Sequence, residues 1–225
     1  TIGLGFAGAL TLTGPVLKWL QEPLGQELYF FSPTEAFWTH LKVALFVGLF
    51  LALPVVLYEG WRFLAPGLYR RERRYALLFV LLSLFFLMLG LLFCAYVALP
   101  FAMKFLISFG TDRGIKPLIS IGMYMDFILK FYLAFGLIFQ LPLALTLLSR
   151  MGLLTAQFLA RHRKYAFLVN AIVAAILTPT SDIFNLLLML IPLTILYELG
   201  ILGARLFGSV KRYAAGEVER HAGAA

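Results

Sequence analysis

One charged segment of the chain has a composition that could bind a ligand. It runs from Arg62 to Arg74, RFLAPGLYRRERR, and separates two long apolar segments. Within it a single carboxylate, Glu72, stands among four arginines. The carboxylate could pair with these neighbours, an interaction that contributes little at a surface. The alternative is that Glu72 receives a cationic ligand from outside the loop.

Polar side chains within or beside the apolar segments form a second group of candidates. Gln140 and Asn170 lie inside apolar runs, where a polar group usually faces a partner or a cavity. They could form hydrogen bonds between helices, or they could carry a function. Asp182 precedes the last apolar segment, where it could cap a helix or contact a partner. Asp126 and Lys130 have the i,i+4 spacing that favours a local ion pair.

No set of residues indicates catalysis or a bound metal. The three histidines, His40, His162 and His221, lack the spacing of a zinc site. Neither a nucleophile elbow of the GxSxG type nor a P-loop is present. Cys94 is the single cysteine and lies in an apolar run, so it is interpreted as a packing residue. We therefore expect no enzyme activity, no cofactor and no metal.

The composition indicates a polytopic membrane protein. Hydrophobic residues make up 62% of the 225 residues and charged residues 13%. Soluble domains have about half and about a quarter, respectively. The net charge of +8 could suggest nucleic acid as a partner. However, the basic residues gather in loops between apolar segments, which is typical of membrane topology, so nucleic-acid binding is not expected. The chain is expected to form a single membrane domain, 1–225.

An all-α membrane fold with six transmembrane helices and two long outer loops follows from the apolar runs. Ser32-Pro33-Thr34-Glu35 is a capping box with proline at the first helical position, which predicts a helix start. Pro100 marks the expected end of the third helix. The fifth run would reach only about 20 Å as a helix, against a hydrocarbon core of about 30 Å. The fifth helix is therefore expected to be short. The expected helices are 1–17 (truncated at its start), 35–58, 75–99, 124–148, 165–177 and 183–203, with a tail at 204–225.

The distribution of lysine and arginine predicts the orientation. The loops at 59–74 and 149–164 and the tail hold 13 of the 19 basic residues. The positive-inside rule places these segments in the cytoplasm. With an even number of crossings, both termini then lie inside. The chain begins abruptly in apolar sequence, so we also expect a further segment upstream of residue 1.

Several motifs resemble the TatC family, the receptor subunit of the twin-arginine translocase. The resemblance is carried by LPVVLYEGWRFLAPGLYRRERR at 53–74, together with motifs that follow the family's order along the chain. It extends from about residue 15 onward. The family also has six helices with both termini inside, and its fifth and sixth helices are short, so the resemblance implies a short sixth helix here as well. The further motifs are SPTE at 32–35, AFGLIFQLP at 134–142, RHRKY at 161–165, and TPTSDIF at 178–184 with the Ile191-Pro192 pair.

The resemblance implies a function in protein export. TatC binds the twin-arginine signal peptides of folded proteins and serves as a scaffold in the bacterial cytoplasmic (inner) membrane. It assembles with the single-helix subunits TatA and TatB in an oligomer, and the proton-motive force drives export without a nucleotide. The family therefore implies a multi-pass receptor with no catalytic role.

The resemblance also assigns site residues. Glu72 falls where the family's loop carboxylate contacts the arginines of the signal. A carboxylate can accept a guanidinium through two parallel hydrogen bonds, which explains a preference for arginine over lysine. Phe63, Arg73 and Arg74 match other positions of the same recognition loop. Thr178 and Asp182 fall in the region that resembles the family's contact surface for the partner helices.

Three departures from the family limit what is implied. The given sequence does not include the family's cytoplasmic N-terminal segment, which shares signal binding. Many relatives have an acidic residue at the position of Gln140, so a proton-linked role there is not expected. Leu186 stands where some relatives have glutamine. An alternative function is a small secondary transporter or ion pathway that uses Gln140, Asn170 and Lys130, although such proteins usually show an internal repeat that this sequence lacks.

Overall fold

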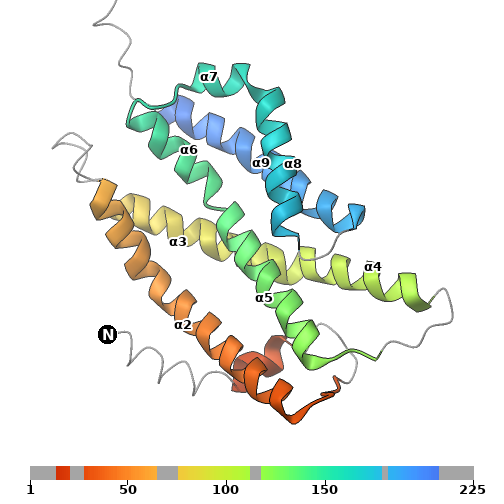
Figure 1. The fold of residues 1–225 in the computed structure, drawn as a ribbon. Coiled ribbons are helices and arrows are strands. Elements are labelled where there is room, and N and C mark those ends of the chain that lie inside the picture. The colour runs from red at the N-terminus through yellow and green to blue at the C-terminus, as the bar shows by residue number, and fades with distance from the viewer. Residues whose placement is uncertain (1–13, 21–27, 65–75, 112–117, 179–181, 208–225) are drawn as a thin grey trace, which may run out of the picture.

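The structure is a computed structural model that describes residues 14–20, 28–64, 76–111, 118–178 and 182–207. In these ranges every regular element is helical, apart from one isolated bridge between Tyr29 and Ser120. The expected all-α fold is therefore confirmed. The labelled elements, shown in Figure 1, are α2 (Pro33–Leu64), α3 (Ala76–Phe93), η4 (Cys94–Ala98), α4 (Leu99–Thr111), α5 (Ile121–Ile138), α6 (Leu141–Arg150), α7 (Ala156–Arg161), α8 (Arg163–Leu177) and α9 (Ile183–Phe207).

Four helical segments of the described chain are long and apolar enough to cross a membrane. α8 has 15 residues and would reach about 22 Å, which is the short helix expected at this place. α9 is not short: it has 25 residues and continues to Phe207, beyond the expected end at 203. The four spans are Pro33–Glu59, Leu78–Thr111, Ile121–Arg150 and Ile183–Phe207.

The third span continues past Pro100, so the expected helix end at this proline is wrong. The five residues of η4 form a π-helical turn in which the Leu99 N–H donates to the Cys94 carbonyl. A proline inside an α-helix lacks an N–H and its ring collides with the carbonyl four residues earlier. The wider π-turn immediately before Pro100 relieves that collision. Helix α4 takes up residues 101–111 of the second long outer loop, which the sequence places at 101–123 and for which it allows a helical part.

The fourth span is divided where a single helix was expected over 124–148. α5 begins at Ile121 because the Ser120 side chain accepts a hydrogen bond from the Met123 N–H. It ends at Ile138, and α6 starts at Leu141 with Pro142 in its first turn. Proline is favoured at a helix start, where its missing N–H has no acceptor to lose. The break places Gln140 between two helices.

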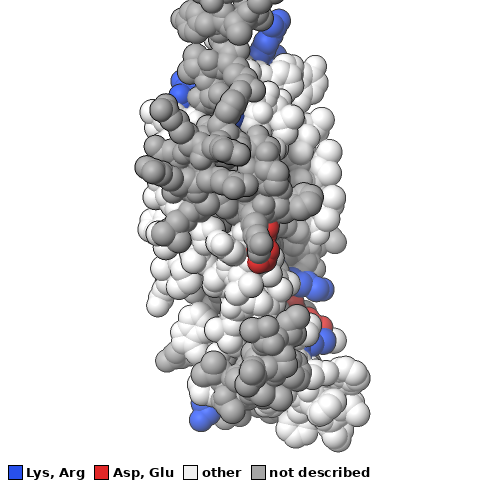
Figure 2. Space-filling model, turned by 90° about the vertical axis from the view of Figure 1, so that its left-hand side faces the viewer, with Lys and Arg blue, Asp and Glu red and all other residues white. Residues whose placement is uncertain are grey.

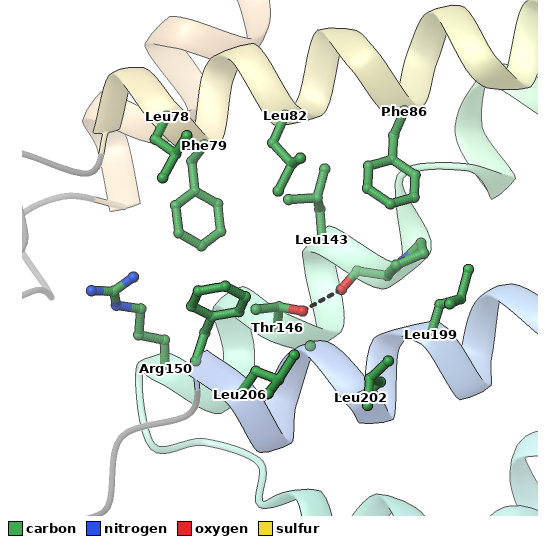
Figure 3. Close-up of a pocket in the computed structure, with 13 residues that line it drawn as sticks. Leu78, Phe79, Leu82, Phe86, Leu143, Thr146, Arg150, Leu199, Leu202 and Leu206 are labelled. Carbon is green, nitrogen blue, oxygen red and sulfur yellow. Dashed lines mark hydrogen bonds between the residues drawn. The ribbon is translucent and has the colours of Figure 1, made fainter.

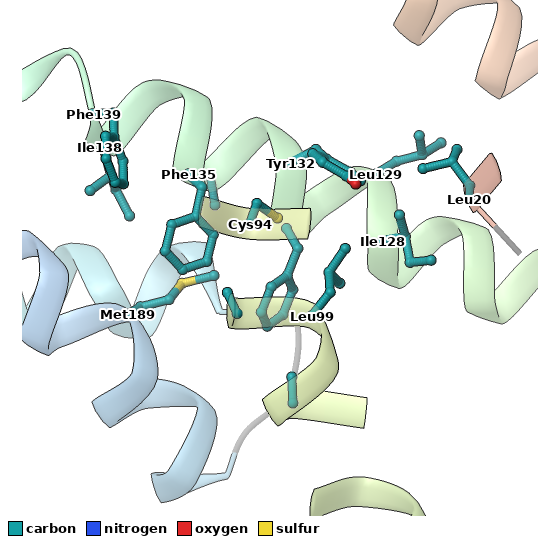
Figure 4. Close-up of a cluster of buried hydrophobic side chains, with 14 of the residues drawn as sticks. Leu20, Cys94, Leu99, Ile128, Leu129, Tyr132, Phe135, Ile138, Phe139 and Met189 are labelled. Atoms are coloured by element: carbon teal, nitrogen blue, oxygen red, sulfur yellow. The ribbon is translucent and has the colours of Figure 1, made fainter. Parts of the chain in front are cut away.

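α5 is the centre of the hydrophobic core. It packs against α2 and α3 and also contacts α8 and α9. Phe131 and Phe135 of α5 are fully buried, and Phe135 points toward Met189 of α9 (Figure 4). Cys94 has no exposed surface in this cluster, as expected for a packing residue.

The start of α2 is tied to the start of α5. The Glu35 carboxylate accepts the Phe31 N–H at 2.8 Å within its own turn. Across the interface it also accepts the Gly122 N–H at 2.8 Å and the hydroxyl of Ser120. The capping-box residue thus serves the helix start that the sequence predicts, and in addition it joins two helices. The backbone of Tyr29 pairs with the same segment, which reinforces the junction.

The outer surface of the helices is apolar. Leu45 of α2, Ile176 of α8 and Ile183 of α9 are 67%, 76% and 78% exposed. Uncharged side chains also make up most of the described surface on the face seen in Figure 2. Because so much apolar surface faces outward along the spans, the surrounding medium must be lipid.

Candidate functional site

The charged loop that the sequence singles out joins α2 to α3. Phe63 lies in the last turn of α2, whereas Glu72, Arg73 and Arg74 lie outside the described residues. The end of α2 and the start of α3 lie close together at the upper left of Figure 1. The C-terminal ends of α6 and α9 point toward the same end of the molecule. The segments that the sequence marks as basic therefore leave the bundle from one end.

Gln140 forms two hydrogen bonds with another helix. Its Oε1 accepts from the Ser83 hydroxyl at 2.5 Å, and its Nε2 donates to the Ser83 carbonyl at 3.1 Å. Ser83 belongs to α3, so the pair joins α3 to the break between α5 and α6. Of the two interpretations considered for Gln140, hydrogen bonding between helices describes what the structure contains. The Gln140 side chain is a neutral amide, and both its oxygen and its nitrogen are hydrogen-bonded to Ser83. This arrangement requires no proton transfer.

Asn170 is buried in α8, with 4% of its surface exposed. Its Nδ2 finds no hydrogen-bond acceptor among the described residues. An unsatisfied buried donor costs about 1–3 kcal/mol relative to a satisfied one. The Asn170 amide nitrogen therefore does not make the interhelical hydrogen bond considered for it, which sets it apart from Gln140.

Thr178 follows the end of α8, and Asp182 precedes the start of α9. The Thr178 hydroxyl lies 2.6 Å from the Ala174 carbonyl and 3.4 Å from the Met189 sulfur. Asp182 Oδ1 accepts the Asn185 N–H at 2.7 Å, and Oδ2 accepts the Asn185 side-chain amide at 2.9 Å. This is the geometry of an N-cap, so Asp182 stabilises the start of α9. Both side chains are partly exposed at that end of the bundle.

The expected local ion pair of Asp126 with Lys130 is wrong. Asp126 of α5 instead pairs with Lys42 of α2, whose Nζ lies 2.7 and 2.9 Å from the two carboxylate oxygens. The i,i+4 spacing only brings two side chains near each other. Packing of α2 along α5 brings Lys42 closer still. Sequence reasoning missed Lys42 because its partner lies 84 positions away.

Comparison with known proteins places the chain in a family. A family model described as TatC, Sec-independent protein translocase protein, matches residues 1–192. The chain belongs to the TatC family. The TatC protein of Desulforapulum autotrophicum is 43% identical over 218 residues, covering 93% of this chain and 79% of that protein. The TatC protein of Aquifex aeolicus is 40% identical over 191 residues, covering 84% and 78%.

Solved TatC structures share the fold. A crystal structure of the twin-arginine translocase receptor TatC aligns with a TM-score of 0.79 at 37% identity, covering 91% of this chain and 92% of that one. A second crystal structure, of the same receptor in DDM, aligns with a TM-score of 0.80 at 38% identity, covering 89% and 91%. As a TatC protein, the chain is a multi-pass component of a protein translocase in the bacterial cytoplasmic membrane, and it is not an enzyme.

Proposed function

We propose that this TatC protein is the receptor for twin-arginine signal peptides and the assembly scaffold for export of folded proteins, driven by the proton-motive force. The observation that carries the proposal is the match to the twin-arginine translocase receptor over nine tenths of both chains. The position of the charged loop at one end of the bundle supports it. No nucleotide-binding motif is needed for this function, and the sequence has none.

The proposed signal site is the loop between α2 and α3. Glu72 receives the guanidinium groups of the signal, and Phe63, Arg73 and Arg74 complete the recognition loop. Phe63 is at the end of α2, next to the start of the loop. A carboxylate can accept two parallel N–H bonds from a guanidinium.

The proposed topology has six helices with both termini in the cytoplasm. Four spans, the short helix α8 and the helical residues 14–20 together supply six segments. The excess of basic residues in 59–74, 149–164 and the tail supports the orientation. In this topology the Thr178–Asp182 turn faces the outside and the signal loop faces the cytoplasm.

The direct test of the receptor function compares two peptides. A twin-arginine signal peptide and its twin-lysine variant are titrated against the full chain in nanodiscs. We expect the arginine peptide to bind at least tenfold more tightly, because lysine cannot form the forked bidentate contact. Equal binding of the two peptides would contradict the proposal. Flux of a small solute through liposomes holding the chain alone would favour the transporter alternative instead.

The proposed partners are the single-helix subunits TatA and TatB, contacting the outer ends of α8 and α9 near Thr178 and Asp182. A cysteine at Ile176, which is 76% exposed on α8, is expected to crosslink to a cysteine in the partner helix. Leu45→Cys on α2, also well exposed, is the matched control and is expected to give no crosslink. The native Cys94 is buried, so its background is low. Crosslinks from Leu45→Cys alone would refute this contact surface.

A further inference from the structure

A groove runs along part of the length of three helices. It has a volume of about 480 Å³ and lies between α3, α6 and α9 (Figure 3). Side chains from α3 point across the groove toward those of α6 and α9. The lining residues are Leu78, Phe79, Leu82, Phe86, Pro142, Leu143, Thr146, Arg150, Leu199, Leu202, Gly203, Leu206 and Phe207.

The length of the groove matches one leaflet. On each of the three helices the lining residues span nine residues: 78–86, 142–150 and 199–207. The eight rises between the first and the last of nine helical residues correspond to about 12 Å. Half of a hydrocarbon core of about 30 Å is about 15 Å. The groove is therefore nearly as long as one leaflet is deep.

The polar groups of the groove are concentrated at one end. Arg150 is the single charged residue of the lining, and its guanidinium carbon lies 5.8 Å from the centre of the Phe79 ring. This distance allows a cation–π contact that holds the guanidinium at the mouth. Thr146, farther in, donates its hydroxyl to the Pro142 carbonyl at 2.7 Å. The interior thus offers apolar side chains and no carboxylate.

Apolar side chains line most of the length of the groove, so it suits a hydrocarbon chain. Such a chain can lie along the groove while its headgroup stays at the mouth.

We propose that this groove is a binding site for an anionic phospholipid, with one acyl chain between α3, α6 and α9 and the phosphate on Arg150. A guanidinium can bind phosphate oxygens through two N–H groups at once. A zwitterionic lipid would bring an ammonium close to the same arginine, whereas phosphatidylglycerol brings no cation. The lipid comes from the leaflet on the side of Arg150, which is the cytoplasmic leaflet in the proposed orientation. The site does not depend on the receptor function.

The experiment uses the full chain in liposomes with phosphatidylglycerol or phosphatidylcholine that carries the same photoactivatable group in its acyl chain. Mass spectrometry then locates the labelled residues. We expect labels on groove residues such as Leu82, Leu143 and Leu202, with phosphatidylglycerol favoured about fivefold, as one basic side chain near a membrane surface provides. Arg150→Gln should reduce phosphatidylglycerol labelling to the phosphatidylcholine level.

Two further variants separate the site from general effects. Arg161→Gln removes one charge from α7 without touching the groove, so the lipid preference should persist. Leu82→Trp fills the groove and should lower labelling by both lipids, which tests the site even if Arg150→Gln does not fold. The inference is overturned if wild-type chain labels equally with both lipids, if the preference survives in Arg150→Gln, or if the labels lie outside the groove. Crosslinks of groove residues to the tail at 208–225 or to a second protein would also overturn it.

Discussion

Replacing Glu72 by alanine is expected to weaken binding of a twin-arginine signal peptide by about 10- to 150-fold. Hydrogen bonds to a charged group are worth about 1.5–3 kcal/mol, and each 1.4 kcal/mol is a factor of ten in affinity. The alanine variant loses both acceptors of the carboxylate and leaves the signal's guanidinium among like charges. The measurement is the dissociation constant of the labelled peptide with the full chain in nanodiscs.

Two comparisons make the expected result specific to recognition of arginine. Glu72→Ala should abolish the difference between the arginine peptide and the lysine peptide, because that difference depends on the carboxylate. Glu27→Ala removes a carboxylate from the outer loop expected between helices 1–17 and 35–58, and it should leave the affinity unchanged. Glu72→Asp keeps the charge and should recover part of the binding. An unaltered affinity in Glu72→Ala and Glu72→Gln would remove Glu72 from the site.

Gly90→Ala is expected to lower the stability of the bundle by about 1–3 kcal/mol, and Gly90→Leu by more. Gly90 is buried in α3 where this helix crosses α5. A Cβ at Gly90 would lie 2.9 Å from both the carbonyl oxygen of Phe135 and the Cβ of Phe139. One of these atoms belongs to the backbone of α5, so the two helices must move apart. The measurement is the thermal unfolding midpoint of the purified chain in detergent.

Gly110→Ala is the matched control for Gly90→Ala. Gly110 lies near the end of α4, and a Cβ there would meet no atom within 4 Å. Alanine is preferred over glycine in a helix by about 1 kcal/mol, so the midpoint should stay the same or rise slightly. Equal loss of stability in both variants would mean that the close approach of α3 and α5 does not determine the effect at Gly90.

The positions of the helix ends show where prediction from the sequence succeeds. The capping box at Ser32–Glu35 predicts the start of α2 because a cap depends only on residues within one turn. Pro100 misleads for a related reason: a local rule predicts a helix end, but a π-turn lets the helix continue through the proline. Packing of η4 and α4 against neighbouring helices, which no local rule contains, favours the continuous helix.

The candidate sites differ in the same way. The resemblance of the loop at 53–74 predicts roles for Glu72 and Phe63, because the family motif is contiguous in sequence. The partners of the intramembrane polar residues could not be predicted. Ser83 is 57 positions from Gln140, and nothing near either residue in the sequence identifies the other. The groove with Arg150 at its mouth escaped prediction for the same reason, since three distant helices form it.

The sequence by itself determined the medium, the fold class and the family of this protein. Apolar run length, loop charge and contiguous motifs are properties of neighbouring residues, and they suffice for an all-α membrane protein of the TatC type. The tertiary structure decided which groups meet: Lys42 with Asp126, Ser83 with Gln140, and Glu35 with the start of α5. These pairs depend on how helices cross. A crossing is a sum of many weak contacts between distant segments, so it becomes definite only when the whole bundle packs.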